Sequence, residues 1–106
     1  MGGELRELLR ELKAGLTAIY GSQLRAVYFY GSYARGDYDE ESDLDVLVVL
    51  EDFAGYGAEV DRTSALVSAL SLEYGVSISQ VFVRARDWAG DDSFFITNVR
   101  QEAILA

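Results

Sequence analysis

The segment FYGSYARGDYDEESDLDVLVVL, residues 29–50, holds the side chains of this chain that are best suited to chemistry. Asp43 and Asp45 are two positions apart, and residues two apart on a strand point to the same face, so their carboxylates are expected side by side. Two carboxylates held that close resist joint ionisation, and a divalent cation relieves their repulsion. The pair therefore predicts a metal site of the two-metal kind, in which the ions lie about 4 Å apart.

A Gly-Ser pair precedes the aspartates and predicts a phosphate-binding turn. Gly31 gives the backbone conformational freedom and lets a ligand approach it closely. Ser32 is expected to cap the turn or short helix that follows, where exposed amide groups attract phosphate. The guanidinium of Arg35 suits phosphate oxygens, and it could equally pair with the neighbouring acids. Together with the aspartate pair, these residues indicate phosphoryl or nucleotidyl transfer.

Hydrophobic periodicity predicts the elements that must position these residues. Helices are predicted over residues 4–20, 57–74 and 93–101, strands over 24–30, 43–50 and 76–83, and a strand or turn over 103–105. The long polar connection after the first strand allows the first two strands to pair antiparallel, and the crossover helix brings the third strand in parallel to the second. The expected fold is α+β (mixed α/β), a small mixed sheet with helices packed on it.

The apolar pattern also predicts which side chains are buried. The run Val46 to Leu50 indicates a strand covered on both faces. The tyrosines of the first strand, at positions 28 and 30, are expected to pack rather than to stack on a nucleobase, and at least two of the three aromatic residues Trp88, Phe94 and Phe95 are expected in the core. The first helix should bury a stripe that ends at Ile19, and the inward residues of the second are predicted to be Val60, Leu66, Val67, Leu70 and Tyr74.

Missing residue types limit the chemistry. The 106 residues are expected to form a single domain, and they include no cysteine and no histidine, which excludes disulfides, thiolate metal sites and the usual base near neutral pH. Any metal must be held by oxygen, which favours magnesium, manganese or calcium. The acidic loop that starts at Asp37 fails as an EF-hand, because Ser42 stands where glycine is needed and Val48 where glutamate is needed. Its acids are expected to be solvated.

Charge and hydropathy exclude further classes. The formal net charge of −9 opposes direct binding to nucleic acid, which is itself a polyanion. No apolar stretch approaches the roughly 20 residues that span a bilayer. The start MGGELRELL lacks the basic and apolar regions of a signal peptide, and Arg6 stands where N-myristoylation needs Ser or Thr. A soluble cytoplasmic protein is expected.

The strings GSYARG, DYDEE and SDLDVLVVL resemble the minimal nucleotidyltransferases of the DNA polymerase β superfamily, whose signature is Gly-Ser, a spacer and Asp-x-Asp. The ending FFITNVRQEAIL is also similar to the C-terminal segment of these proteins. The resemblance implies the polymerase-β-like fold, with Gly31 and Ser32 on the triphosphate of ATP or another nucleoside triphosphate and with Asp43 and Asp45 on Mg²⁺ or Mn²⁺. It further implies a helical partner protein of the HEPN type, to which this chain would be the antitoxin.

The chain departs from this family in one respect. Active members carry a third carboxylate on the later strand, where it completes the metal site and helps to deprotonate the acceptor hydroxyl. The corresponding strand here is VSISQVFV, with Ser77 or Ser79 at the expected place, and Asp87 comes several residues too late. Neither serine can act as a carboxylate, and loss of a general base lowers the rate typically by about 10²–10⁴-fold.

Three hypotheses follow from these residues. The first is a nucleotidyltransferase that moves NMP, AMP if the substrate is ATP, to a hydroxyl on a partner protein or a small molecule. The second is a catalytically degenerate module that binds a partner or a nucleotide, which the serines on the third strand favour. The third is a nucleotide sensor. The sequence leaves the acceptor and the oligomeric state open, a homo-oligomer included.

Overall fold

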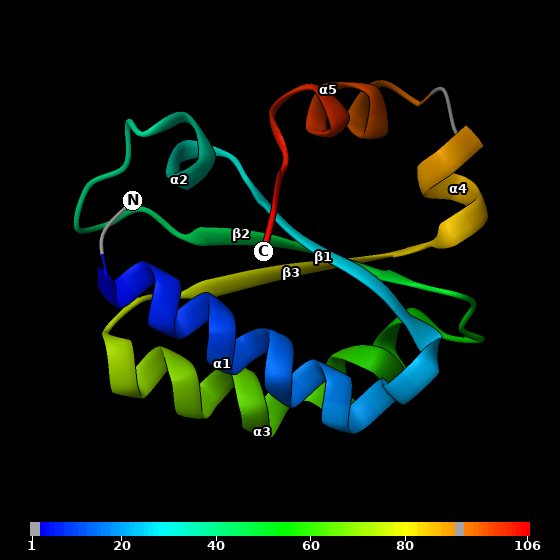
Figure 1. The fold of residues 1–106 in the computed structure, drawn as a ribbon, viewed down its shortest axis with the longest axis horizontal. Coiled ribbons are helices and arrows are strands. Elements are labelled where there is room, and N and C mark those ends of the chain that lie inside the picture. Colours follow the sequence, from blue (N-terminus) through cyan, green and yellow to red (C-terminus); the bar gives the residue numbers. More distant parts are fainter. Residues whose placement is uncertain (1–2, 91–92) are drawn as a thin grey trace.

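The computed structural model describes residues 3–90 and 93–106, which form a four-stranded sheet with helices on both faces (Figure 1). The elements in chain order are α1 (Gly3–Tyr20), a 3₁₀ turn η1 (Gly21–Gln23), β1 (Leu24–Tyr30), α2 (Ser32–Arg35), β2 (Leu44–Leu50), α3 (Tyr56–Tyr74), β3 (Ile78–Arg84), α4 (Ala85–Gly90), α5 (Phe94–Glu102) and β4 (Ile104–Leu105). Within the described ranges, no helix has the length and apolar character that crossing a membrane requires.

The sheet has the mixed topology that the sequence predicts. Its strand order is β3-β2-β1-β4, in which β1 pairs antiparallel with β2, and β3 pairs parallel with β2. The terminal strand is confirmed as β4, which pairs antiparallel with β1 at the opposite edge from β3. The predicted fold class, a mixed sheet with helices packed on it, is confirmed.

One face of the sheet is covered by α1 and α3, which lie side by side in Figure 1. The stripe of leucines on α1 at positions 8, 9, 12 and 16 is buried against the even-numbered residues 44, 46, 48 and 50 of β2. Each such leucine contributes about 1.5–3 kcal/mol when it leaves water. The apolar stripe of α1, which follows the helical period, and the alternate residues of β2 therefore pack together in one core.

The opposite face of β2 carries Leu47 and Val49, which pack against Val99 of α5 and Trp88 of α4. All residues from Val46 to Leu50 are buried, as predicted for a strand covered on both faces. Because alternate residues face opposite sides, Asp45 lies on the face that α4 and α5 cover.

The prediction for the inward face of α3 is partly wrong, because polar residues take the place of an apolar one. Val60 is 42% exposed, whereas Glu59 and Thr63 are buried. The Glu59 carboxylate accepts a hydrogen bond of 2.8 Å from the Tyr20 hydroxyl, and the Thr63 hydroxyl donates to the Glu59 carbonyl at 2.9 Å. These polar groups can be buried because each has a partner. The predicted burial of Ile19 at the end of the α1 stripe is also wrong, since Ile19 is 37% exposed.

The prediction that at least two of the three aromatic residues near the C-terminus lie in the core is wrong. Trp88 is half-buried on α4, a helix that the sequence reading treated as a connection, but Phe94 and Phe95 are 86% and 43% exposed. The reason is that α5 turns Ile96 and Val99 toward the sheet, and this leaves its first residues outside. The strand tyrosines pack as expected, Tyr28 against Trp88 and Tyr30 edge-on against Phe95.

Candidate nucleotide and metal site

A tight turn connects the end of β1 to α2, and its shape depends on glycine. Gly31 has φ 73° and ψ −151°, a combination that residues with a side chain rarely adopt. Gly36 is the C-cap of α2 and also has a positive φ, 84°. The amides of Ala34 and Arg35 both donate to the Gly31 carbonyl. The expected cap is wrong in detail: Gly31 is the N-cap, no side chain caps α2, and Ser32 is its first helical residue.

The turn lies directly against the carboxylate of Asp45. A Cβ built on Gly31 would overlap Asp45 Oδ2 and lie 3.3 Å from Asp45 Cγ. Two features therefore favour glycine at this position: the backbone conformation, and the close approach of the carboxylate, which would have to move if a Cβ were present. The Asp45 carboxylate therefore lies directly against the backbone of the turn.

The two aspartates occupy the start of β2. Asp45 is half-buried and lies opposite Tyr30 of β1, and Asp43 is exposed just before the strand. The pKa of Asp45 is raised mainly by its burial and further by the negative charge of Asp43. The positive charge of Arg35 acts in the opposite direction and lowers it. The repulsion that the sequence spacing predicts thus operates between these two carboxylates, and a divalent cation would relieve it.

The register of β2 and β3 separates the two candidate serines. Asp45 pairs with Ser79, whereas Ser77 precedes β3 and uses its carbonyl to accept the Leu44 amide at 2.8 Å. Position 79 is therefore the one beside Asp45. Because β3 runs parallel to β2, it carries the chain away from Asp45, and Asp87 follows at the far end of the sheet. Within the described residues, no three carboxylate, histidine or cysteine side chains are grouped closely enough to hold a metal.

One acidic residue of the site was not predicted. Glu102, the last residue of α5, accepts a hydrogen bond of 3.0 Å from the Gly31 amide and pairs with Arg35, whose Nη1 lies 3.2 Å from Glu102 Oε2. Arg35 also contacts Asp37, with Nε and Oδ2 3.3 Å apart, so its pairing with acids, one of the two sequence alternatives, is observed. No local spacing could reveal Glu102, because its partners lie 67 and 71 positions earlier in the chain.

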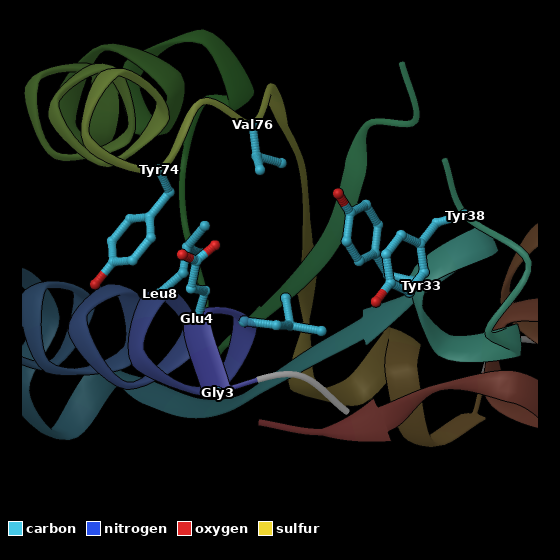
Figure 2. Close-up of a pocket in the computed structure, with 8 residues that line it drawn as sticks. Gly3, Glu4, Leu8, Tyr33, Tyr38, Tyr74 and Val76 are labelled. Atoms are coloured by element: carbon cyan, nitrogen blue, oxygen red, sulfur yellow. The ribbon is translucent and has the colours of Figure 1, made fainter. Parts of the chain in front are cut away.

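A separate pocket lies on the α1 and α3 side of the turn. Its volume is about 350 Å³, and Tyr33 of α2 stacks on Tyr38 at its border, with ring centroids 4.1 Å apart. Figure 2 shows these two rings on one side of the pocket and Tyr74 on the other. Neither Asp43 nor Asp45 is among the described residues that line it, so this pocket is not the predicted metal site.

The Gly-Ser turn, the Asp-x-Asp strand and the mixed sheet together define a nucleotidyltransferase. Residues 5–103 match the family model described as the nucleotidyltransferase domain. The chain belongs to that family, and within it to the minimal nucleotidyltransferases of the polymerase β superfamily, a class of transferases.

Named relatives agree with this assignment. "Putative protein adenylyltransferase MJ0141" of Methanocaldococcus jannaschii is 37% identical over 81 residues, which cover 76% of this chain and 81% of the relative. A second protein of that organism, "Putative protein adenylyltransferase MJ0604", is 36% identical over 73 residues, covering 69% of this chain and 67% of its own.

Solved structures agree in fold. A chain described as a putative minimal nucleotidyltransferase superposes with a TM-score of 0.60 and 29% identity, covering 94% of this chain and 93% of its own. A chain from a toxin–antitoxin crystal structure with AMP-PNP gives a TM-score of 0.64 at 20% identity, covering 89% and 68%.

Proposed function

We propose that this chain, as a single domain over residues 1–106, is a Mg²⁺- or Mn²⁺-dependent nucleotidyltransferase that moves AMP from ATP to a hydroxyl group on a partner protein. The observation that carries the proposal is the contact between the Gly31 turn and the Asp45 carboxylate. This contact brings a backbone suited to phosphate beside a carboxylate suited to a cation. The names of two relatives, each a "putative protein adenylyltransferase", support adenylate as the transferred group.

The residues present fit a hard divalent cation. Asp43 and Asp45 offer only oxygen ligands, which magnesium prefers, and their mutual repulsion favours a bound cation. A bound cation would neutralise charge on the triphosphate as the leaving group departs. Because Gly31 has no Cβ, the Asp45 carboxylate can lie directly against the backbone of the turn.

In the proposed reaction, the residues of the turn hold the triphosphate in place. The Ser32 amide and hydroxyl and the Arg35 guanidinium would contact phosphate oxygens. The acceptor oxygen attacks the α-phosphorus, the bond to pyrophosphate breaks, and the hydroxyl proton passes to water. Ser79 has no ionised group to take that proton, so we expect turnover to be slow.

The partner that we propose is a helical toxin of the HEPN type. A protein of similar fold has been solved as an MNT antitoxin in complex with a tri-AMPylated HEPN toxin. By analogy, the acceptor hydroxyl would lie on the partner, and its modification would silence the toxin.

The test is incubation of the purified chain with labelled ATP, Mg²⁺ and the partner. We expect label on the partner with the natural chain and none with the double variant Asp43→Ala, Asp45→Ala. Asp61→Asn removes a carboxylate from the exposed side of α3 and is the matched control. Equal transfer by the double variant and the natural chain would exclude this site.

The serine beside Asp45 favours a second candidate, a module that binds nucleotide or partner without turnover. In that case the double aspartate variant should bind the partner with unchanged affinity. Ser79→Asp separates the two candidates, because transfer that appears only in this variant would mark the natural chain as a binding module. A nucleotide sensor would bind ATP with Mg²⁺ in calorimetry and would also transfer nothing.

A further inference from the structure

Glu102 contacts both ends of α2, the short helix of the phosphate turn. Its Oε1 accepts the Gly31 amide at the N-cap, and its Oε2 lies 3.2 Å from Nη1 of Arg35, the last residue of the helix. The two contacts come from one carboxylate on α5, which reaches the turn from another layer of the fold.

The turn needs such support. A helix of four residues is far below the length at which helices are stable by themselves, so tertiary contacts must hold α2 in place. An exposed ion pair alone contributes little, and the Arg35 side chain is 49% exposed. The hydrogen bond from a backbone amide to an ionised carboxylate is stronger, and it acts on the residue whose conformation only glycine adopts readily.

The contacts of Glu102 leave donors for a ligand. Glu102 engages Nη1 of Arg35 and Asp37 engages Nε, whereas no hydrogen bond between described residues uses Nη2. Ser32 is likewise not a partner of Glu102. A triphosphate could therefore bind while Glu102 stays in place.

We propose that Glu102 is a positioning residue of the nucleotide site, which fixes the Gly31 turn and aims Arg35 at the phosphates. The inference rests on the proposed function, because it assigns Glu102 a part in the same site. It also explains how an acidic side chain can lie beside an anion site: the carboxylate binds the arginine and does not meet the phosphate. A carboxylate in the phosphate's own place would instead compete with the nucleotide.

The test is calorimetric titration of the full chain with ATP and Mg²⁺. Glu102→Ala should weaken binding about tenfold, the loss expected for one charge-assisted hydrogen bond. Glu102→Gln should weaken it less, because the amide oxygen still accepts from Gly31. Gln101→Ala, an exposed neighbour on the same helix, should bind like the natural chain.

A second measurement separates positioning from general stabilisation. In the background of Arg35→Ala, the change Glu102→Ala should weaken binding less than in the natural chain, because part of its effect passes through Arg35. Melting temperatures show whether each variant is folded. If Glu102→Ala does not fold, the near-isosteric Glu102→Gln is used for the binding measurements instead.

Three results would overturn the inference. Tighter binding by Glu102→Ala would make Glu102 a competitor of the phosphate. Unchanged binding by both Glu102 variants, with normal binding by the natural chain, would show that the contacts are structural only and would leave the proposed function intact. No binding by the natural chain would defeat the proposed function and the inference with it.

Discussion

Replacing Gly31 with alanine tests the central geometry of the site. The substitution adds one methyl group at the position where the turn meets Asp45. Two separate penalties are expected, one from the backbone and one from the carboxylate.

The backbone penalty follows from φ 73° and ψ −151°, a region that is populated almost entirely by glycine. Holding another residue there costs on the order of 1–3 kcal/mol. The carboxylate penalty follows from the overlap of the new Cβ with Asp45 Oδ2, which forces the side chain to turn away. For a domain of this size, 1–3 kcal/mol corresponds to a loss of about 5–20 °C in melting temperature.

The assays are thermal unfolding and calorimetric binding of ATP with Mg²⁺. Gly36→Ala is the matched control, since Gly36 also has a positive φ, 84°, but a Cβ there would meet nothing within 4 Å. We expect Gly36→Ala to lose about 1–2 kcal/mol of stability and to retain nucleotide binding. Gly31→Ala should lose both, because its methyl group displaces the carboxylate of Asp45, which we propose as a metal ligand.

The double variant Gly31→Ala, Asp45→Ala isolates the two penalties. It removes the overlap and keeps the backbone strain, so it should be more stable than the sum of the single changes predicts. The reasoning would be refuted if Gly31→Ala melted and bound nucleotide like the natural chain.

Three further changes test other parts of the molecule. Asp45→Asn should raise the melting temperature of the metal-free protein at neutral pH: the fold raises the pKa of Asp45, so its ionised form destabilises the folded state, and the gain should disappear as the pH falls below the ordinary value of 3.8. Ser79→Asp should raise adenylate transfer by up to about 10²–10⁴-fold in a labelled-ATP assay, whereas Ser77→Asp, which lies outside the β2–β3 pairing, should not. Tyr20→Phe should lower the free energy of unfolding in urea by about 1–3 kcal/mol, because it removes the hydroxyl that donates to buried Glu59.

Each of these has an outcome that contradicts it. A pH-independent gain for Asp45→Asn would mean that the ionised carboxylate in its half-buried site is not the source of the gain. Equal gains in adenylate transfer for Ser79→Asp and Ser77→Asp would mean that the pairing of Ser79 with Asp45 does not determine which position supports transfer. An unchanged urea midpoint for Tyr20→Phe would mean that Arg62, which also contacts Glu59 at 3.0 Å, satisfies it alone.

The sequence was sufficient for features that depend on neighbouring residues. The strand periods, the Asp-x-Asp spacing and the Gly-Ser turn are local, and the strands follow from them. The parallel pairing follows from the helix that connects the second strand to the third. Glu102 could not be found in this way, because a glutamate near the end of a helix carries no sign of a contact with Gly31. The burial of Glu59 was missed for the same reason, since it depends on the hydroxyl of Tyr20 in another helix.

Other errors came from helix orientation. The sequence of α5 contains several apolar residues, and which of them reach the sheet depends on how the helix lies across it. Ile96 and Val99 point inward, and Phe94 remains outside. The cap of α2 was misplaced by one residue, because a glycine with positive φ can itself occupy the N-cap position.

The pairing of Ser79 with Asp45 has a consequence for how such a protein could gain or lose activity. The Ser79 side chain is exposed and belongs to neither hydrophobic core, so the packing of the core does not depend on this side chain. The strand that carries it is fixed instead by backbone pairing with β2 and by Phe82 in the core. Under the proposed function, the residue that governs the rate is thus separate from the residues that hold the fold, and a single exchange at position 79 is expected to change the rate while the core stays the same.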